Sequence, residues 1–141
     1  MKTQIISHQF DINPVPASRP RVSRWSTYYP KKYTRFKKEM EALTGELDTT
    51  PCESLVVVSL RFKIKIPQSW SKKKRLEREN TYCNNNSDID NYIKAMLDSL
   101  NGVYFIDDRQ VVEVFASKKY SNEPRILFTM MDMDNDKRGD V

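Results

Sequence analysis

The clearest pattern of hydrophobic and polar positions lies between residues 53 and 66. A valine-rich apolar run leads into strict alternation of apolar and basic side chains. The alternating residues are Leu60, Phe62, Ile64 and Ile66 on one side and Arg61, Lys63 and Lys65 on the other. A period of two residues is typical of a half-buried strand, so this segment predicts a long β-strand with one basic face.

Two other segments repeat apolar residues at helical spacing. In residues 31–44 the repeated positions are Tyr33, Phe36, Met40 and Leu43, and Gly45 follows as a stop signal. In residues 89–101 they are Ile89, Ile93, Met96, Leu97 and Leu100, and Asn101 and Gly102 close the segment. The spacing predicts two amphipathic helices.

Shorter apolar segments complete the predicted fold. We expect further strands at about residues 2–10, 110–119 and 125–131, and a charged insertion whose residues 69–80 could hold a short surface helix. The order β-α-β-α-β-β indicates an α/β (α+β) protein with a small mixed sheet and helices packed on it. A chain of 141 residues fits one domain, predicted over residues 1–131, followed by a disordered tail over residues 132–141.

The basic residues are unevenly distributed. The chain has 24 Lys and Arg against 19 Asp and Glu, a formal net charge of +5. Between Ile12 and Lys38 there are basic residues, aromatic residues and prolines, but no acidic residue. We call residues 12–33 the basic arm and residues 69–86 the charged insertion. This distribution favours a polyanionic partner, most simply nucleic acid.

The cysteines and the N-terminal segment favour a cytoplasmic protein. Cys52 and Cys83 belong to no CxxC or secreted-type framework, so we expect two reduced thiols. The N-terminal segment is too interrupted for the apolar core of a signal peptide, and no run approaches the roughly 20 apolar residues of a membrane span. We therefore expect no association with membranes.

Four carboxylates surround the predicted helix at residues 89–101. Asp88 and Asp90 lie where it begins, and Asp107 and Asp108 lie in the loop that follows it. If the helix starts near Asp90, the preceding segment is extended, and residues two apart in such a segment point the same way. Asp88 and Asp90 could then converge, and Asp107 and Asp108 could close the same cluster from the following loop. Converging carboxylates repel one another, so a cluster of this kind is tolerable chiefly around a cation.

The same residues also have ordinary explanations. Asp88 and Ser87 are candidates for the helix N-cap, and Asp90 suits the solvated face of an amphipathic helix. Lys94 is one turn from Asp90, so it could be a plain i,i+4 ion-pair partner or could hold a scissile phosphate.

The available ligands decide which cation fits. The carboxylates are hard oxygen donors, the single histidine, His8, lies far away in the first predicted strand, and the cysteines form no motif. Mg²⁺, or alternatively Mn²⁺, is therefore favoured over zinc. A Mg²⁺ ion on two or three carboxylates keeps several waters and binds phosphate oxygens. Beside a basic arm, such a site indicates phosphodiester hydrolysis by a metal-activated water.

Other sites are excluded by their missing parts. The tail has the Asp132, Asp134, Asp136 alternation of a calcium loop, but Lys137 occupies the place of the turn glycine. No [DE]xK tripeptide of the restriction-type nucleases occurs, and one histidine cannot furnish a histidine-based nuclease site. With three glycines in all, the chain has no phosphate-binding loop and we expect no nucleotide cofactor.

As a set, these residues resemble the RusA family of Holliday-junction resolvases, found in bacteria and in their phages and prophages. The resemblance rests on DIDN at residues 88–91, on Lys94 and Asp98, and on FIDDRQVV at residues 105–112. An arm rich in Pro, Arg and Tyr before the first helix is also similar to the family. The match covers about residues 4–132, although the charged insertion is longer than in compact members. Ser87 stands where compact members often have a basic residue.

The resemblance implies a homodimeric, Mg²⁺-dependent endonuclease that nicks opposed strands of a four-way DNA junction in recombination and repair. It implies that Asp88, Asp90 and Asp108 are catalytic metal ligands, that Asp107 is an accessory ligand, and that Lys94 is the catalytic lysine. A dimer suits this chemistry, because a chain with one metal cluster cuts one strand and a two-fold dimer presents two equivalent sites.

The arm and the insertion supply the expected DNA contacts. The candidates are Arg19, Arg21, Arg24, Trp25, Tyr28, Lys31, Lys32, Lys72, Lys73 and Lys74. Their cations would follow phosphates, and their aromatic rings would stack on bases near the crossover. Two alternatives stay open. One is a non-catalytic junction- or DNA-binding protein with a structural divalent cation, and the other is a metal nuclease acting on flaps or duplex DNA.

Overall fold

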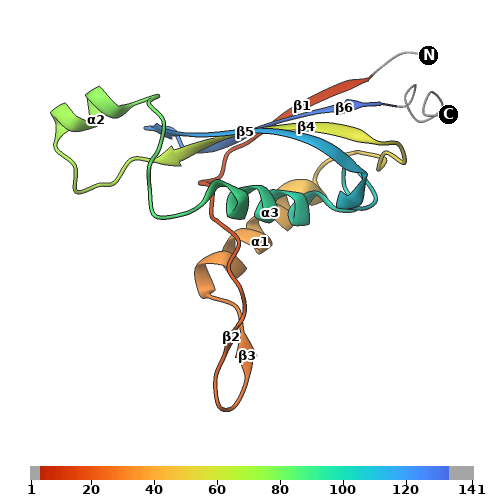
Figure 1. The fold of residues 1–141 in the computed structure, drawn as a ribbon, viewed down its shortest axis with the longest axis horizontal. Helices are drawn as coiled ribbons and strands as arrows, with labels where there is room; N and C mark the ends of the chain where they lie inside the picture. Colours follow the sequence, from red (N-terminus) through yellow and green to blue (C-terminus); the bar gives the residue numbers. More distant parts are fainter. Residues whose placement is uncertain (1–3, 134–141) are drawn as a thin grey trace.

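A computed structural model describes residues 4–133 and contains a four-stranded mixed sheet with helices under one face (Figure 1). The sheet is built from β1 (Ile5–Phe10), β4 (Val56–Lys65), β5 (Val111–Ser121) and β6 (Arg125–Asp132), in the spatial order β1-β6-β4-β5. β6 is antiparallel to both of its neighbours, whereas β4 and β5 are parallel. Parallel neighbours require a crossover connection, and the chain from β4 to β5 provides it through two helices.

The helices are α1 (Lys31–Gly45), α2 (Lys72–Arg78) and α3 (Ile89–Leu100). α1 and α3 lie side by side under the sheet, and α2 lies at the end of the sheet where β4 ends (Figure 1). α1 and α3 each bury an apolar stripe, formed by Tyr33, Phe36 and Met40 in α1 and by Tyr92, Ala95, Met96 and Leu100 in α3. These helices and the strand order confirm the predicted mixed sheet with helices packed on it.

The alternation along β4 has the predicted consequence. The even-numbered residues from Val56 to Ile64 are buried against the helices. The odd-numbered residues, including Arg61 and Lys65, face the other side and are half-buried or exposed. The sheet therefore has one apolar face, which the helices cover, and one open face that is basic at one end.

The basic arm contains a hairpin that the sequence pattern did not predict. β2 (Arg21–Val22) and β3 (Thr27–Tyr28) pair antiparallel and project away from the sheet on the side of α1 and α3 (Figure 1). Ser23 stabilises the turn, because its Oγ accepts hydrogen bonds from the backbone N–H groups of Trp25 (3.3 Å) and Ser26 (3.0 Å). A stretch too short and polar to show strand periodicity is thus ordered by a local side-chain bond.

The charged insertion and the C-terminal end of the sheet can also be compared with expectation. The short surface helix predicted within the insertion is α2, and it begins where Ser71 Oγ accepts a hydrogen bond from the Lys74 backbone N–H. Asp132, predicted to belong to the tail, ends β6, and the Met133 N–H donates to the Leu55 carbonyl. The rest of the predicted tail, and the start of the first predicted strand, lie outside the described residues. No helix within residues 4–133 has the length and apolar character needed to cross a membrane.

Candidate active site and nucleic-acid surface

Asp88 and Asp90 lie at the N-terminal end of α3. Asp88 occupies the N-cap position in an extended conformation (φ −74°, ψ 145°). An extended segment before the helix is what the sequence predicts. Its side chain makes no capping hydrogen bond, so capping does not explain this carboxylate. Asp90 follows in the first turn and is exposed. Both carboxylates are available to a ligand.

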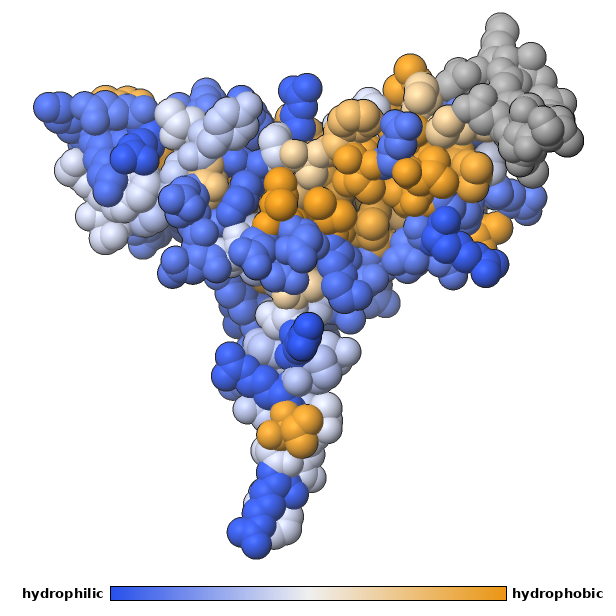
Figure 2. All heavy atoms as spheres, in the orientation of Figure 1, coloured by the Kyte–Doolittle hydropathy of each residue, from blue (hydrophilic) through white to orange (hydrophobic). Residues whose placement is uncertain are grey.

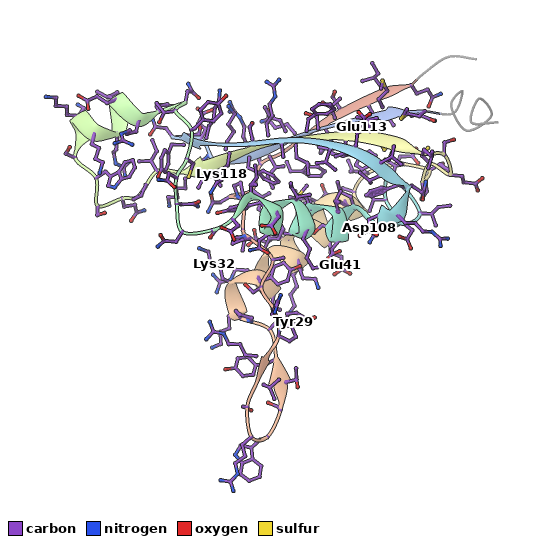
Figure 3. All side chains as sticks on the ribbon, in the orientation of Figure 1. Tyr29, Lys32, Glu41, Asp108, Glu113 and Lys118 are labelled. Atoms are coloured by element: carbon purple, nitrogen blue, oxygen red, sulfur yellow. The ribbon has the colours of Figure 1, made fainter. Side chains whose placement is uncertain are left out.

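Lys118 of β5 fixes the loop that leads to Asp88. Its Nζ donates to the Asn85 side-chain oxygen at 2.7 Å and to the Ser87 carbonyl at 2.6 Å. The Asn85 amide in turn donates to the Tyr92 hydroxyl at 2.8 Å. Figure 3 labels Lys118 at the end of the sheet above the start of α3. The Asn-rich loop is therefore tied both to the sheet and to the helix.

The polar face of α3 borders a cavity of about 390 Å³ between the arm and α1. Its charged lining residues are Arg19, Lys37, Asp90, Lys94 and Asp98. Lys94 pairs with Asp98 at 3.5 Å, and its side chain is 67% exposed. The ion pair therefore joins Lys94 to the acid one turn after it, whereas the sequence suggested the acid one turn before it.

Asp107 and Asp108 lie beyond the other end of α3, where Asp108 begins the single 3₁₀ turn η1 (Asp108–Gln110). The Arg109 backbone N–H donates to an Asp107 carboxylate oxygen at 3.0 Å. This bond, followed by a side-chain hydrogen bond with Asp108, lowers the pKa of Asp107. Burial raises the pKa of Asp108, and the neighbouring carboxylates Asp107 and Asp98 raise it further, while Lys94 opposes the change. Asp108 is thus a carboxylate that lacks a sufficient counter-charge.

Gln110 anchors the loop that carries this pair. Its side-chain oxygen accepts from the backbone N–H groups of Ile106 and Asp107, each at 2.9 Å. Its amide nitrogen donates to the carbonyls of Cys52 (2.7 Å) and Ser54 (2.8 Å) before β4. Sequence reasoning gave no role to Gln110 or to Lys118. The signal for Lys118 was its register, because it occupies a helix-facing position of β5 between Ala116 and Tyr120.

The two carboxylate pairs lie at opposite ends of α3 (Figures 1 and 3). A helix of 12 residues is roughly 18 Å long at 1.5 Å per residue. Among the described residues, no group of three or more His, Cys, Asp or Glu side chains is arranged to hold a metal ion. The expected convergence of all four carboxylates within one chain is therefore not found. The pattern predicts the direction of these side chains, but the length of α3 keeps the two pairs apart.

The basic arm places its aromatic residues in solvent. Trp25 at the hairpin tip is 87% exposed, and the Arg24 guanidinium lies 5.5 Å from its ring centroid. Arg21 and Tyr28 are also exposed on the hairpin, and Lys31 and Lys32 are exposed at the start of α1. The base of the arm is fixed to α3, since the Ala17 N–H donates to the Asn91 carbonyl at 2.9 Å. The arm therefore extends from beside Asp90.

Lys72, Lys73 and Lys74 occupy a different part of the molecule. They are exposed on α2, at the end of the sheet and away from the hairpin (Figure 1). Lys74 lies 4.2 Å from the centroid of the Trp70 ring. The predicted DNA contacts thus divide into two separate basic surfaces.

Comparisons with known proteins show what this chain is similar to. The family model described as "Endodeoxyribonuclease RusA" matches residues 11–131. The chain is also similar to "Uncharacterized protein YqaN" of Bacillus subtilis (strain 168), with 31% identity over 122 residues, which cover 80% of this chain and 86% of that protein. The region matched by the family model contains the arm, both ends of α3 and the loop that carries Asp108.

Proposed function

This chain belongs to the RusA family of endodeoxyribonucleases, and we propose that it resolves four-way DNA junctions by Mg²⁺-dependent hydrolysis of phosphodiester bonds. The observation that carries the proposal is the cavity that joins Asp90 and Lys94 to Arg19 of the basic arm. It combines a free carboxylate with cations that attract a phosphodiester. The cavity adjoins a hairpin whose exposed tryptophan suits stacking on unpaired bases.

The residues proposed to hold the metal are Asp88, Asp90 and Asp108. They offer the hard oxygen ligands that Mg²⁺ prefers, and Asp107, which already accepts one backbone hydrogen bond, is a candidate accessory ligand. A bound Mg²⁺ would supply an acidic water and stabilise negative charge on the phosphate oxygens. Lys94 is exposed and reaches into the same cavity. We assign it to the scissile phosphate, which it would contact after leaving Asp98.

A second copy of the chain could complete the carboxylate set. In a two-fold dimer with antiparallel α3 helices, Asp88 and Asp90 of one copy approach Asp108 of the other. β5 is an edge strand of the sheet, and β4 is its neighbour in the sheet; residues 80–83 bond only to the C-terminal part of its other edge. Val112, Val114 and Phe115 are exposed on it, and Figure 2 shows apolar surface over this side of the sheet. We propose this β5 surface as the dimer interface, because exposed apolar side chains of this kind mark interaction sites. The dimer itself is proposed because one chain does not bring its two carboxylate pairs together.

The catalytic assignment is tested by cleavage of a synthetic four-way junction with Mg²⁺. We expect Asp90→Asn to cut at least about a hundredfold more slowly than wild type, whereas Asp48→Asn, which removes an exposed carboxylate outside the site, cuts at the wild-type rate. Equal rates for wild type and Asp90→Asn would contradict the assignment. Flap and duplex substrates cut faster than the junction would move the proposal to another class of nuclease.

The dimer interface is tested by sedimentation and cleavage together. Phe115→Ser replaces a side chain that is 61% exposed, so folding should survive the change. We expect the variant to sediment as a monomer and to lose paired nicking. A Phe115→Ser protein that stays dimeric would place the interface elsewhere.

A further inference from the structure

The sheet face opposite α1 and α3 carries a row of cations at one end. On β4, Lys63 is directly opposite Lys119 of β5 and directly opposite Arg125 of β6. Neighbouring strands are about 4.8 Å apart, so three cations stand side by side across three strands. Arg61 lies two residues along β4 on the same face. We call these four residues the sheet-face cluster.

The cluster is poorly neutralised by the protein. Arg125 pairs with Glu123 at 2.9 Å, and the Glu123 side chain is 81% exposed. Arg61, Lys63 and Lys119 take part in no ion pair within the described part of the chain. In the same part of the chain, the Arg125 Nε is buried without a hydrogen-bond partner.

The repulsion within this row costs folding energy. Like charges directly opposite each other in a sheet are destabilising. The pKa of Lys63 is lowered, first by burial and then by the charges of Lys119, Arg125 and Arg61. A row of this kind is therefore expected to serve a partner that brings negative charge.

The charged insertion is fixed to the same end of the sheet. Trp70 packs edge-on against Tyr120 of β5, with ring centroids 5.0 Å apart, and the cations of Lys74 and Arg78 lie over the Trp70 ring. Backbone bonds join Asn80, Thr81 and Cys83 to β5. Tyr82 is 74% exposed, and Lys119 lies 4.9 Å from its ring centroid. The insertion thus adds further cations at the same end of the sheet, and the exposed ring of Tyr82 contacts the sheet-face cluster directly through Lys119.

We propose that the sheet-face cluster, together with α2, is a second nucleic-acid surface that binds the phosphate backbone of a DNA segment other than the one at the basic arm. This inference rests on the proposed function. The cluster lies on the sheet face opposite the helices, whereas the hairpin projects on the side of the helices (Figure 1), so one straight duplex cannot touch both. Figure 2 shows hydrophilic surface at the α2 end of the molecule and apolar surface at the other. The charge of this end matches a polyanion, and a four-way junction offers several duplex arms.

The test compares charge removal with charge retention at two positions. Lys63→Gln/Lys119→Gln removes two cations, and Lys63→Arg/Lys119→Arg keeps them. Affinity for a synthetic four-way junction is measured in EDTA over a range of salt, so that no cleavage occurs. We expect the Gln variant to bind at least about tenfold more weakly at 0.1 M salt, with a salt slope smaller by about 2. Its Tm should be equal to or above that of wild type, because like charges are removed.

The possible outcomes separate this inference from the proposed function. If the Gln variant keeps wild-type affinity and slope while Arg19→Gln/Arg24→Gln weakens binding, the second surface is refuted and the nuclease proposal stands. If the Arg variant binds as weakly as the Gln variant, phosphate contact by charge is refuted. If wild type binds neither junction nor duplex, both proposals fail. If the Gln variant keeps full affinity for DNA and only wild type binds an acidic protein, the cluster belongs to that protein partner and the second DNA surface is refuted.

Discussion

Lys118 and Lys119 are adjacent on β5 and are predicted to respond oppositely to removal of their charges. Lys118 donates two short hydrogen bonds to the loop before Asp88. Lys119 lies on the other face of the sheet, opposite Lys63. The two positions have the same side chain and lie next to each other in the same strand, so each serves as the control for the other.

The magnitude for Lys118→Met follows from its contacts. A hydrogen bond to a charged group contributes about 1.5–3 kcal/mol. The site is only part-buried, so water compensates some of the loss, and we expect about 2 kcal/mol for the pair. Unfolding entropy is about 2.1 cal/mol/K per residue, which for 141 residues converts this loss to a fall in Tm of about 7 °C. Lys119→Met removes a repelled cation and should leave Tm unchanged or raise it.

Function should follow the loop. Because Lys118 positions Asp88 through Asn85 and Ser87, its removal should slow single-turnover cleavage of a four-way junction by roughly 10- to 100-fold, the cost of a misplacement of about 1 Å. Junction affinity at low salt should stay close to wild type, since the bonds of Lys118 are internal. Circular dichroism melts and single-turnover cleavage are the two assays. Lys118→Met and Lys119→Met proteins with the same Tm and the same cleavage rate would refute the positioning role.

Three further results are expected. Asp108→Asn should raise the Tm of the metal-free protein, because burial and the charges of Asp107 and Asp98 disfavour the ionised form of Asp108. The variant should also lose the rise in Tm that Mg²⁺ gives wild type. A metal-free Tm below that of wild type would contradict the first result. Trp25→Ala should keep the wild-type Tm, since the ring is 87% exposed, and weaken junction binding by about 1–3 kcal/mol in a gel-shift titration; unchanged affinity would remove the stacking role. The lowered pKa of Lys63 means that its side chain is protonated more fully in the unfolded chain just below pH 10.5. In that window the stability of wild type to urea should therefore rise with pH relative to the stability of Lys63→Gln, and parallel pH profiles of the two proteins would contradict this.

The main elements of the fold could be predicted because their periodicity is strong and their burial is simple. The predicted segments at residues 31–44 and 89–101 correspond to α1 and α3, and the alternating segment at residues 53–66 corresponds to β4. Each of these buries one face against the other layer, so the local pattern and the tertiary contacts agree. The β2–β3 hairpin has no such face, and its order depends on hydrogen bonds of one serine.

The candidate site could be predicted only in part. The residue types near α3 indicated a hard divalent cation, and the extended conformation at Asp88 is as expected. The helix from Ile89 to Leu100 is uninterrupted, so its length keeps the two carboxylate pairs apart. The two pairs are near each other in the sequence but not in the fold. Contacts across the sheet, such as those of Gln110 with the segment before β4, join residues more than 50 positions apart. Sequence spacing gives no measure of such contacts.

The double lysine in β5 shows why the same residue type needs two explanations. In a strand, successive side chains point to opposite faces, so one lysine serves the loop before α3 and the next serves the sheet-face cluster. A slip of one residue in the β4–β5 register would move every side chain of β5 to the other face. It would bring Lys119 toward Asn85 and Ser87 and would place Tyr120, which is 7% exposed, on the open face. Burial of Tyr120 and its contact with Trp70 therefore fix the register, and through the register they determine which lysine holds the loop before Asp88 and which lies in the cluster that we propose to bind DNA.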